Sequence, residues 1–328
     1  MWALFSSRRR DGFTLVELLI VIVVIAILAA ITIVAYGNIT SRAQIAALQS
    51  DLGQAKTFME GYLAQNGQYP ADLPTAEAAG LKFSVPDSQV SYSVNNNANP
   101  QTWGITESNN SQSYYVNNTG AASPTSGAWV TNLLPNPSIE SGTTANWSFR
   151  WYGNTGGAGT NSVATNGGYK GNDYLHKVWT TASSAQDNGF NSTNSAGTVS
   201  YVSPGTTYTA SAYVRTNRSD VIFKTQIVWQ DATGTTLSSA TGPGVTPAAN
   251  TWTRTSETAV APAGAVESYV IFSNLSNSYS WAVGDTLDMD AAMFVQSGIL
   301  STYTDPLTSP AWSWNGTANN STSTGPTS

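Results

Sequence analysis

The stretch that decides the fold at the start of this chain is residues 8–36, RRRDGFTLVELLIVIVVIAILAAITIVAY. It joins a basic cluster to an apolar run longer than the roughly 18 residues that predict a membrane span. The only charged residue between Asp11 and Arg42 is Glu17. Because a carboxylate inside a membrane helix costs about 2.5–3.5 kcal/mol even on the lenient insertion scale, Glu17 is expected to have a function and a partner.

Two simpler interpretations of this stretch fit less well. A secretory signal has an apolar core of about 7–15 residues followed by a small-residue cleavage site. Here the apolar run is longer, and the Gly12-Phe13 junction precedes it. A plain single-pass anchor would not need Glu17. Neither a secretory signal nor a plain anchor therefore accounts for this stretch.

The residues from Gly12 to Glu17, with the arginines before them, resemble the type IV pilin family, which includes the pseudopilins of type II secretion. The resemblance implies that a prepilin peptidase removes the leader, residues 1–12, and that the new amine of Phe13 is N-methylated. It implies that Glu17 pairs with the Phe13 amine of a neighbouring pilin subunit. It also implies a single-pass precursor in the cytoplasmic membrane and, after assembly, an extracellular pilus on the cell surface.

The composition limits the possible partners and chemistry. The chain of 328 residues has 13 Lys and Arg against 19 Asp and Glu, and charged residues make up 10% of it. The sequence is acidic overall and contains no basic stripe of the kind that binds nucleic acid, so nucleic acid is not expected as a partner. The chain contains no cysteine, although the exported part would meet an environment that permits disulfides. It departs here from the many pilins that pin their C-terminal loop with a disulfide.

The sequence predicts no enzyme. His176 is the only histidine, it lies in an ordinary strand pattern, and no G-x-S-x-G motif is present. A glycosidase would use two carboxylates, but nothing in the sequence singles out a pair among the acids.

An amphipathic stripe continues the helix beyond the apolar run. It consists of Ile45, Leu48, Leu52, Ala55, Met59 and Tyr62, which follow helical spacing. Asn66-Gly67 is a stop signal. We therefore predict one helix over residues 13–65, with residues 13–36 as the transmembrane and assembly half.

The next segment is predicted to form a small headgroup. Short β-prone pieces at 90–94, 103–106 and 114–117 alternate with Asn-rich turns. Pilins pack such a stripe on a small antiparallel sheet, so residues 66–118 are expected to form one. Residues 119–131 are rich in small polar residues and are predicted to be a linker.

Residues 132–297 are predicted to form an all-β second domain. Tyr208–Thr216 alternates apolar and polar side chains, and similar strands follow at 221–230, 252–260, 267–273 and 287–295; this pattern predicts an antiparallel sandwich. The opening segment 132–142 (NLLPNPSIESG) and the later segments 205–215, 228–234 and 287–294 resemble carbohydrate-binding modules of families 4 and 9. The predicted fold is therefore an α+β pilin, a long helix on a small antiparallel sheet, followed by an all-β jelly-roll sandwich.

The resemblance to these modules implies a structural calcium ion between the first and last strands. The matching residues are Glu140, Asp288 and Asp290, and oxygen ligands suit Ca²⁺. The alternative is that they are solvated acids at strand ends. No cofactor is otherwise required.

Aromatic side chains are the candidates for glycan binding, because sugars stack on aromatic faces. The candidates are Trp151, Trp179, Trp229 and Trp281. The alternative is that they form the core, where a Trp of a sandwich usually lies. Trp147 and Trp252 match family positions that we expect to be core.

These features predict a type IV pilus-type subunit, a minor or tip pilin, that displays a glycan-binding sandwich as an adhesin. One alternative is a pseudopilin of a type II secretion or DNA-uptake system whose sandwich contacts protein cargo. Another is a filament subunit whose sandwich binds nothing. The tail, residues 298–328, contains Trp312 and Trp314, which are expected to dock on the sandwich, whereas its last residues are expected to be disordered.

Overall fold

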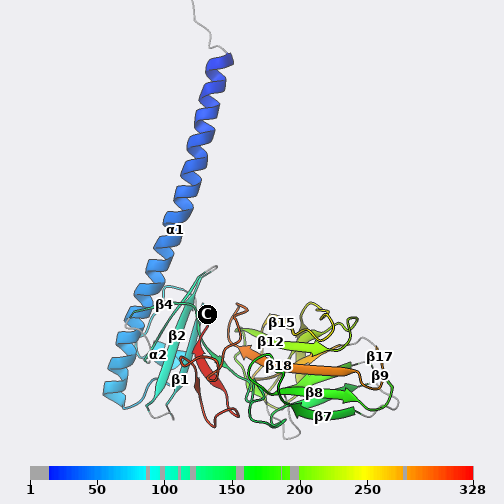
Figure 1. Ribbon diagram of the computed structural model, residues 1–328. Coiled ribbons are helices and arrows are strands. Elements are labelled where there is room, and N and C mark those ends of the chain that lie inside the picture. The colour runs from blue at the N-terminus through cyan, green and yellow to red at the C-terminus, as the bar shows by residue number, and fades with distance from the viewer. Residues whose placement is uncertain are drawn as a thin grey trace, which may run out of the picture. The chain divides into compact units, whose positions relative to one another are not determined.

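The protein is described by a computed structural model (Figure 1). The described residues are 15–85, 89–96, 100–109, 112–118, 123–152, 159–185, 187–192, 199–275 and 279–327. The predicted leader, with Gly12, and the predicted mature N-terminus, Phe13, lie outside these ranges. The chain divides into two compact units, residues 1–48 and residues 49–328.

The long helix α1 spans Leu15–Asn66 without interruption. The window Leu15–Thr32 has a mean hydropathy of 3.1 and no buried residue, and it is long and apolar enough to cross a membrane. Further along, Leu52, Ala55 and Met59 are fully buried, as the amphipathic stripe predicts. The helix ends where Gly67, at φ 72°, donates its N–H to the carbonyl of Leu63, a left-handed conformation that glycine adopts most easily.

A four-stranded antiparallel meander follows, in the order β1-β2-β3-β4. The elements are α2 (Leu73–Ala78), β1 (Val90–Asn95), β2 (Thr102–Ser108), β3 (Ser113–Asn117) and β4 (Thr125–Ser126). Trp103 and Ile105 of β2 alternate toward α1 and pack in one cluster with Leu52 and Met59. The three β-prone pieces of the sequence are thus strands. The short helix α2 was not predicted; Asp72 caps its N-terminus by accepting the N–H of Thr75.

The rest of the chain forms two antiparallel sheets that face one another (Figure 1). The β12 sheet contains β15 (Thr253–Val260), β12 (Thr207–Thr216), β18 (Thr286–Val295), β8 (Tyr174–Trp179) and β7 (Gly159–Ala164), with β5 (Trp129–Asn132) beside the far end of β18. The β13 sheet contains β14 (Thr236–Thr241), β13 (Lys224–Gln230), β16 (Glu267–Ser273), β10 (Asp187–Asn191) and β6 (Ser148–Tyr152), with β11 (Ser200–Tyr201) paired to β16. A separate ribbon pairs β9 (Ser183–Ala185) with β17 (Tyr279–Trp281). The predicted β-sandwich is therefore confirmed.

Alternation along each strand builds the core between the sheets. Ala210, Ala212 and Val214 of β12 face Ile227 and Trp229 of β13 within one buried cluster. Their neighbours in sequence point to the outer faces, because successive side chains of a strand alternate between faces.

The tail differs from its prediction. It forms β19 (Ser313–Trp314) and β20 (Ser323–Pro326), and β20 pairs along β5. Trp312 is buried beside Met293 and Val295 on the outer face of the β12 sheet, as expected of a docking tryptophan. Its ring lies so close to Gly325 that a Cβ there would overlap it. Residues 323–327 are therefore part of the sandwich, and the expectation of a disordered end is wrong for them.

Candidate functional site

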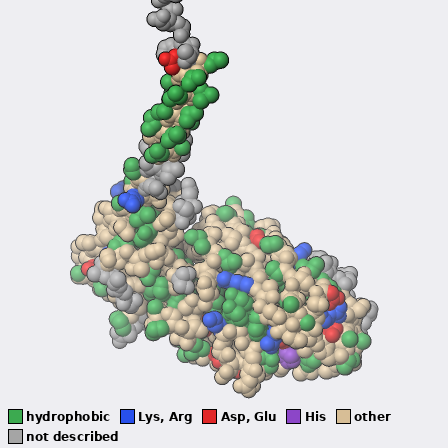
Figure 2. Space-filling view, turned by 45° about the horizontal axis from the view of Figure 1, so that its top comes forward, with side chains coloured by type: hydrophobic (Ala, Val, Ile, Leu, Met, Phe, Trp, Pro, Cys, Tyr) green, Lys and Arg blue, Asp and Glu red, His purple; other side chains and the backbone are tan. Residues whose placement is uncertain are grey.

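The apolar half of α1 is the first candidate functional surface. Leu18, Leu19, Ile22 and Ile25 are each more than half exposed, and hydrophobic side chains cover the face of this segment that Figure 2 shows. A helix that is hydrophobic on all sides is stable only when lipid or other helices surround it. In the single chain this segment therefore exposes an apolar surface that lipid or the helices of other subunits would cover.

Glu17 lies in the first turn of this helix, and its side chain is exposed in the single chain. Negative charge near a helix N-terminus is favourable because the backbone N–H groups there are partly positive. Its predicted partner, the Phe13 amine of another subunit, belongs to a residue outside the described ranges. The pairing therefore stays a prediction.

Three of the four tryptophans predicted to bind sugar are core residues instead. Trp179, Trp229 and Trp281 are at most 2% exposed, and Trp179 stacks on Trp281 with ring centroids 3.9 Å apart. No ring face is left for a ligand, so the prediction is wrong for these three. The reason is strand parity, since Trp179 and Trp229 occupy positions that point between the sheets. The backbone of Trp151 pairs with Asn188 in β6, but its side chain is outside what the structure describes.

The prediction for Trp252 was also wrong, in the opposite sense. Trp147 is buried as expected, whereas Trp252 is partly exposed on the outer face of the β12 sheet. Its indole donates to the carbonyl of Gly167, 3.2 Å away, and the Arg215 guanidinium lies 4.3 Å from its ring centroid. Sequence pattern alone did not mark this Arg–Trp stack, because its members are far apart in the chain.

The predicted calcium ligands do not all come together. One carboxylate oxygen of Asp288 accepts a hydrogen bond from Nε of Arg215 at 2.8 Å. The other lies 2.6 Å from Nδ1 of His176. Among the described residues, no group of three or more acidic or histidine side chains could hold a metal. Asp288 therefore does not fit the calcium role, because its two oxygens already face these partners.

Glu140 and Asp290 instead hold the loop before β8. One Glu140 oxygen accepts the N–H groups of Asn172 and Asp173, both at 2.7 Å, and Asp290 accepts the N–H of Lys170 at 2.8 Å. Burial raises the pKa of Asp290 to about 8, and the charge of Glu140 adds to the shift. These backbone donors stabilise the two carboxylates without a cation. A calcium ion at Glu140 and Asp290 stays a prediction.

The outer face of the β13 sheet carries polar side chains around a few buried apolar ones, among them Val228 and Ile271. In one row across the strands Asn191 pairs with Ile271, which pairs with Gln226. Nearby, Nε of Arg150 donates to Asp187 at 2.5 Å. The other Asp187 oxygen and the amide oxygen of Asn191 are buried without a described hydrogen-bond partner. This face therefore carries amide side chains and an Arg–Asp ion pair, whereas these two acceptor oxygens are closed to solvent.

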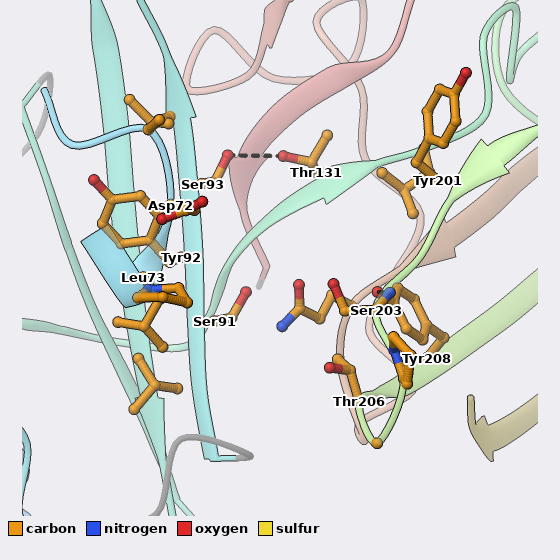
Figure 3. A pocket seen from close by; sticks show the side chains of 18 of the residues that line it. Asp72, Leu73, Ser91, Tyr92, Ser93, Thr131, Tyr201, Ser203, Thr206 and Tyr208 are labelled. Atoms are coloured by element: carbon orange, nitrogen blue, oxygen red, sulfur yellow. Dashed lines mark hydrogen bonds between the residues drawn. The ribbon is translucent and has the colours of Figure 1, made fainter. Parts of the chain in front are cut away.

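A groove of about 680 Å³ lies between the small sheet and one end of the sandwich. Figure 3 shows Asp72 and Tyr92 on one side and Tyr201 and Tyr208 on the other. The Ser93 and Thr131 hydroxyls meet across it at 2.9 Å. Its lining mixes hydroxyls with apolar groups and shows no charged cluster that would select a ligand.

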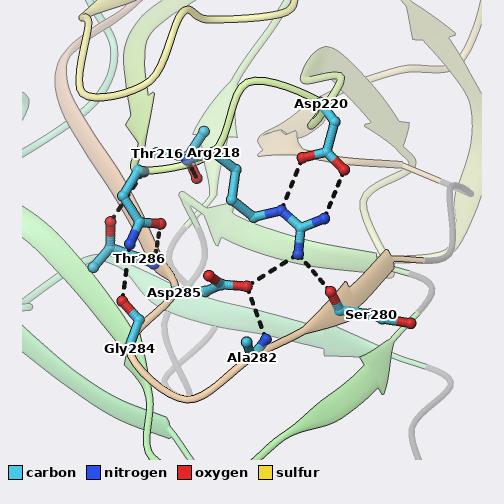
Figure 4. A network of polar contacts seen from close by, with 9 residues as sticks. Thr216, Arg218, Asp220, Ser280, Ala282, Gly284, Asp285 and Thr286 are labelled. Carbon is cyan, nitrogen blue, oxygen red and sulfur yellow. Dashed lines mark hydrogen bonds and ion pairs between the residues drawn. The ribbon is translucent and has the colours of Figure 1, made fainter.

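Arg218 closes the end of the sandwich near β17 (Figure 4). It donates to both oxygens of Asp220, at 2.9 and 2.6 Å, and to Asp285 at 3.0 Å, and it also donates to the carbonyl of Ser280. Its guanidinium lies 5.2 Å from the Trp281 ring. These bonds tie the loop after β12 to the loop before β18, which is a structural role.

Comparison with known proteins identifies similarities in two parts of the chain. Residues 7–33 match the family model described as the prokaryotic N-terminal methylation motif. The chain is 34% identical over 130 residues to the type IV wide pilus major component PilA4 of Thermus thermophilus, covering 38% of this chain and 90% of that protein. It is 42% identical over 69 residues to fimbrial protein EcpB of Eikenella corrodens, which is 21% of this chain and 40% of EcpB. The chain thus spans less than half the length of the Eikenella relative.

Among solved structures, the chain is similar to the CBM22-1 xylan-binding domain of Paenibacillus barcinonensis Xyn10C, with 16% identity, 53% of this chain and 97% of that chain covered, and a TM-score of 0.35. It is also similar to tailspike protein 4 of bacteriophage CBA120, with 14% identity, 50% and 21% coverage, and a TM-score of 0.36. Scores this low support no conclusion about a ligand of this chain.

Proposed function

Because this chain belongs to the type IV pilin family, we propose that it is a subunit of a pilus-type filament and that it displays its sandwich outside the cell. The observation that carries this proposal is the apolar window Leu15–Thr32, in which no residue is buried. Such a surface is satisfied by lipid before assembly and by other copies of the helix after it. Glu17 supplies the single charge that fixes how the copies align.

Processing and assembly follow from the same residues. A prepilin peptidase cuts after Gly12, and the amine of Phe13 is then four positions before Glu17 in the sequence. A carboxylate and an ammonium offset one another's desolvation only when they are closely paired, which favours the register that brings them together. The test is the intact mass of the membrane-extracted chain. A chain that starts at N-methylated Phe13 supports the proposal, whereas a chain that keeps Met1 contradicts it.

The sandwich is proposed to bind a hydroxyl-rich ligand, a surface glycan, on the outer face of the β13 sheet. The support is the set of hydrogen-bonding side chains that alternate outward there: Arg150, Asn191, Gln226, Gln230, Glu267 and Tyr269. Sugar hydroxyls both donate and accept, as amide side chains do. A headgroup of this bulk needs lateral space, which favours a minor or tip position in the filament.

A glycan array probed with the detergent-solubilised full chain tests this binding. Binding that is lost in a Gln226→Ala, Tyr269→Ala variant and kept in Ser256→Ala, on β15 of the other sheet, supports the proposed face. An array without binding would leave the filament proposal intact and favour the pseudopilin alternative, in which the sandwich contacts protein cargo, or a sandwich that binds nothing.

A further inference from the structure

Glu107 is a buried acid on the side of the small sheet that faces α1. On β2, Trp103 and Ile105 pack into the cluster against α1, and Glu107 continues their alternating row. Its side chain is 0% exposed, and neither carboxyl oxygen accepts a hydrogen bond from a described donor. An ionised carboxylate in such a place is costly, so the group takes up a proton instead.

The ionisable group that acts on Glu107 is another carboxylate, that of Asp51 on α1, whose side chain lies within hydrogen-bonding reach of it. Ser84 donates its backbone N–H to one Asp51 oxygen at 2.8 Å, and its hydroxyl donates to the same oxygen. Glu107 has no such described donors, so the two acids are unequal. Burial first, and then the Asp51 charge, raise the pKa of Glu107 to about 8. A hydrogen bond between two carboxyl groups exists only when one of them carries a proton.

We propose that Glu107 and Asp51 form a carboxyl–carboxylate pair that shares one proton and fastens β2 of the headgroup to α1. The proton lies on Glu107, and Asp51 is the acceptor. The pair makes this attachment firm in acid and weaker in alkali.

The groups around Glu107 favour a shared proton over a metal ion as the link between Glu107 and Asp51. At the register of Glu107, β1 presents Val90 and β3 presents Tyr114, and Asp51 is the ionisable neighbour that shifts it. A calcium ion would need about six to eight oxygen ligands. The described groups at this point are the two carboxyls and the Ser84 hydroxyl, and the Glu107 oxygens are closed to water. A proton needs one donor and one acceptor.

The sign of the pH dependence follows from the raised pKa. Below about pH 4.5, its usual pKa, Glu107 is protonated whether the headgroup is closed or open. Between there and about pH 8 the closed form keeps a proton that the open form releases. The opening constant therefore rises by up to about tenfold per pH unit across this window and then levels off.

Hydrogen exchange of the full chain in detergent, followed by mass spectrometry of peptides that cover residues 100–109, tests the proposal. Comparison with Glu107→Gln at each pH removes the intrinsic pH dependence of exchange. We expect the wild type to lose protection relative to Glu107→Gln as the pH rises from about 5 to about 8, because Gln keeps the donor to Asp51 without a titrating proton. Glu60→Gln, an exposed acid on the same helix, should match the wild type.

Parallel curves for wild type and Glu107→Gln would overturn the proposal. So would protection that millimolar calcium, but not magnesium, restores in the wild type at alkaline pH, because a cation would then be the link. If Glu107→Gln does not fold, the carboxyl ¹³C shift of Glu107 is followed in the wild type and in Asp51→Asn. A midpoint near its ordinary value in the wild type would equally sink the idea, and a midpoint that falls in Asp51→Asn supports it.

Discussion

The apolar half of α1 and the β-sandwich satisfy their hydrophobic side chains in opposite ways. In the window Leu15–Thr32 no residue is buried, whereas Phe190, Phe272 and Phe294 of the sandwich are 0% exposed. The apolar half of the helix has no cover within the chain, whereas the sandwich encloses its core between its own two sheets. A single substitution in the helix should therefore act on assembly, and one in the sandwich on folding.

The largest effect is expected from Glu17→Ala, which tests the helix side of this contrast. Removal of one partner from a buried ion pair costs about 3–5 kcal/mol, so assembled filaments should be lost while the chain stays in the membrane. The measurement is the amount of subunit in sheared filaments relative to the membrane fraction. Unchanged filament yield would show that Glu17 has no partner in the assembly.

Trp179→Ala tests the sandwich side. Removal of a buried indole costs about 3–5 kcal/mol, and here it also removes the stack on Trp281. The melting temperature of the sandwich should fall while cleavage after Gly12 continues. Trp252→Ala, on a partly exposed ring, is the control and should cost less; equal losses would contradict the assignment of Trp179 to the core.

Arg218→Ala should have an intermediate effect on the sandwich alone. It leaves Asp285, whose side chain is 16% exposed, with the N–H of Ala282 but without its cation. Loss of such a partner at a largely buried carboxylate costs about 1–3 kcal/mol. Asp220→Asn removes a partner that is 60% exposed and should cost less than about 1 kcal/mol. Chemical denaturation of both variants provides the comparison, and a larger loss in Asp220→Asn would reverse our ranking.

A smaller effect is expected in the pH dependence of the sandwich's stability, which reports whether buried Asp290 is protonated in the folded state. Burial raises the pKa of Asp290 to about 8 from its usual 3.8, so the folded state holds a proton that the unfolded state releases between these values. Stability should therefore fall as the pH rises through this range and level off above it. Near-UV circular dichroism of thermal unfolding measures this, and Asp290→Asn should flatten the slope. If the stability of Asp290→Asn still falls with pH as in the wild type, the proton is bound by a residue other than Asp290.

Calcium should have the smallest effect. Backbone N–H groups already face Glu140 and Asp290, so added calcium should move the melting temperature no more than magnesium does. A calcium-specific rise that disappears in Glu140→Gln would restore the site predicted from the sequence.

The sequence by itself determined the elements whose signal is local. The apolar run with Glu17, the stripe through Leu52 and Met59 and the alternation of Tyr208–Thr216 each follow from spacing along one segment, because helical and strand periodicity fix which side chains share a face. The position of Glu17 after the Gly-Phe junction likewise needed no structure to be noticed.

The tertiary structure decided what depends on segments that are distant in the chain. Whether Trp179 and Trp281 face solvent or one another depends on the pairing of β8, β9 and β17, which strand pattern does not specify. Asp288 faces Arg215 rather than Glu140 for the same reason. Glu107 and Asp51 are 56 positions apart, and only the packing of β2 on α1 makes them neighbours. Burial and the partner of a charge are properties of the folded chain, and they govern its chemistry.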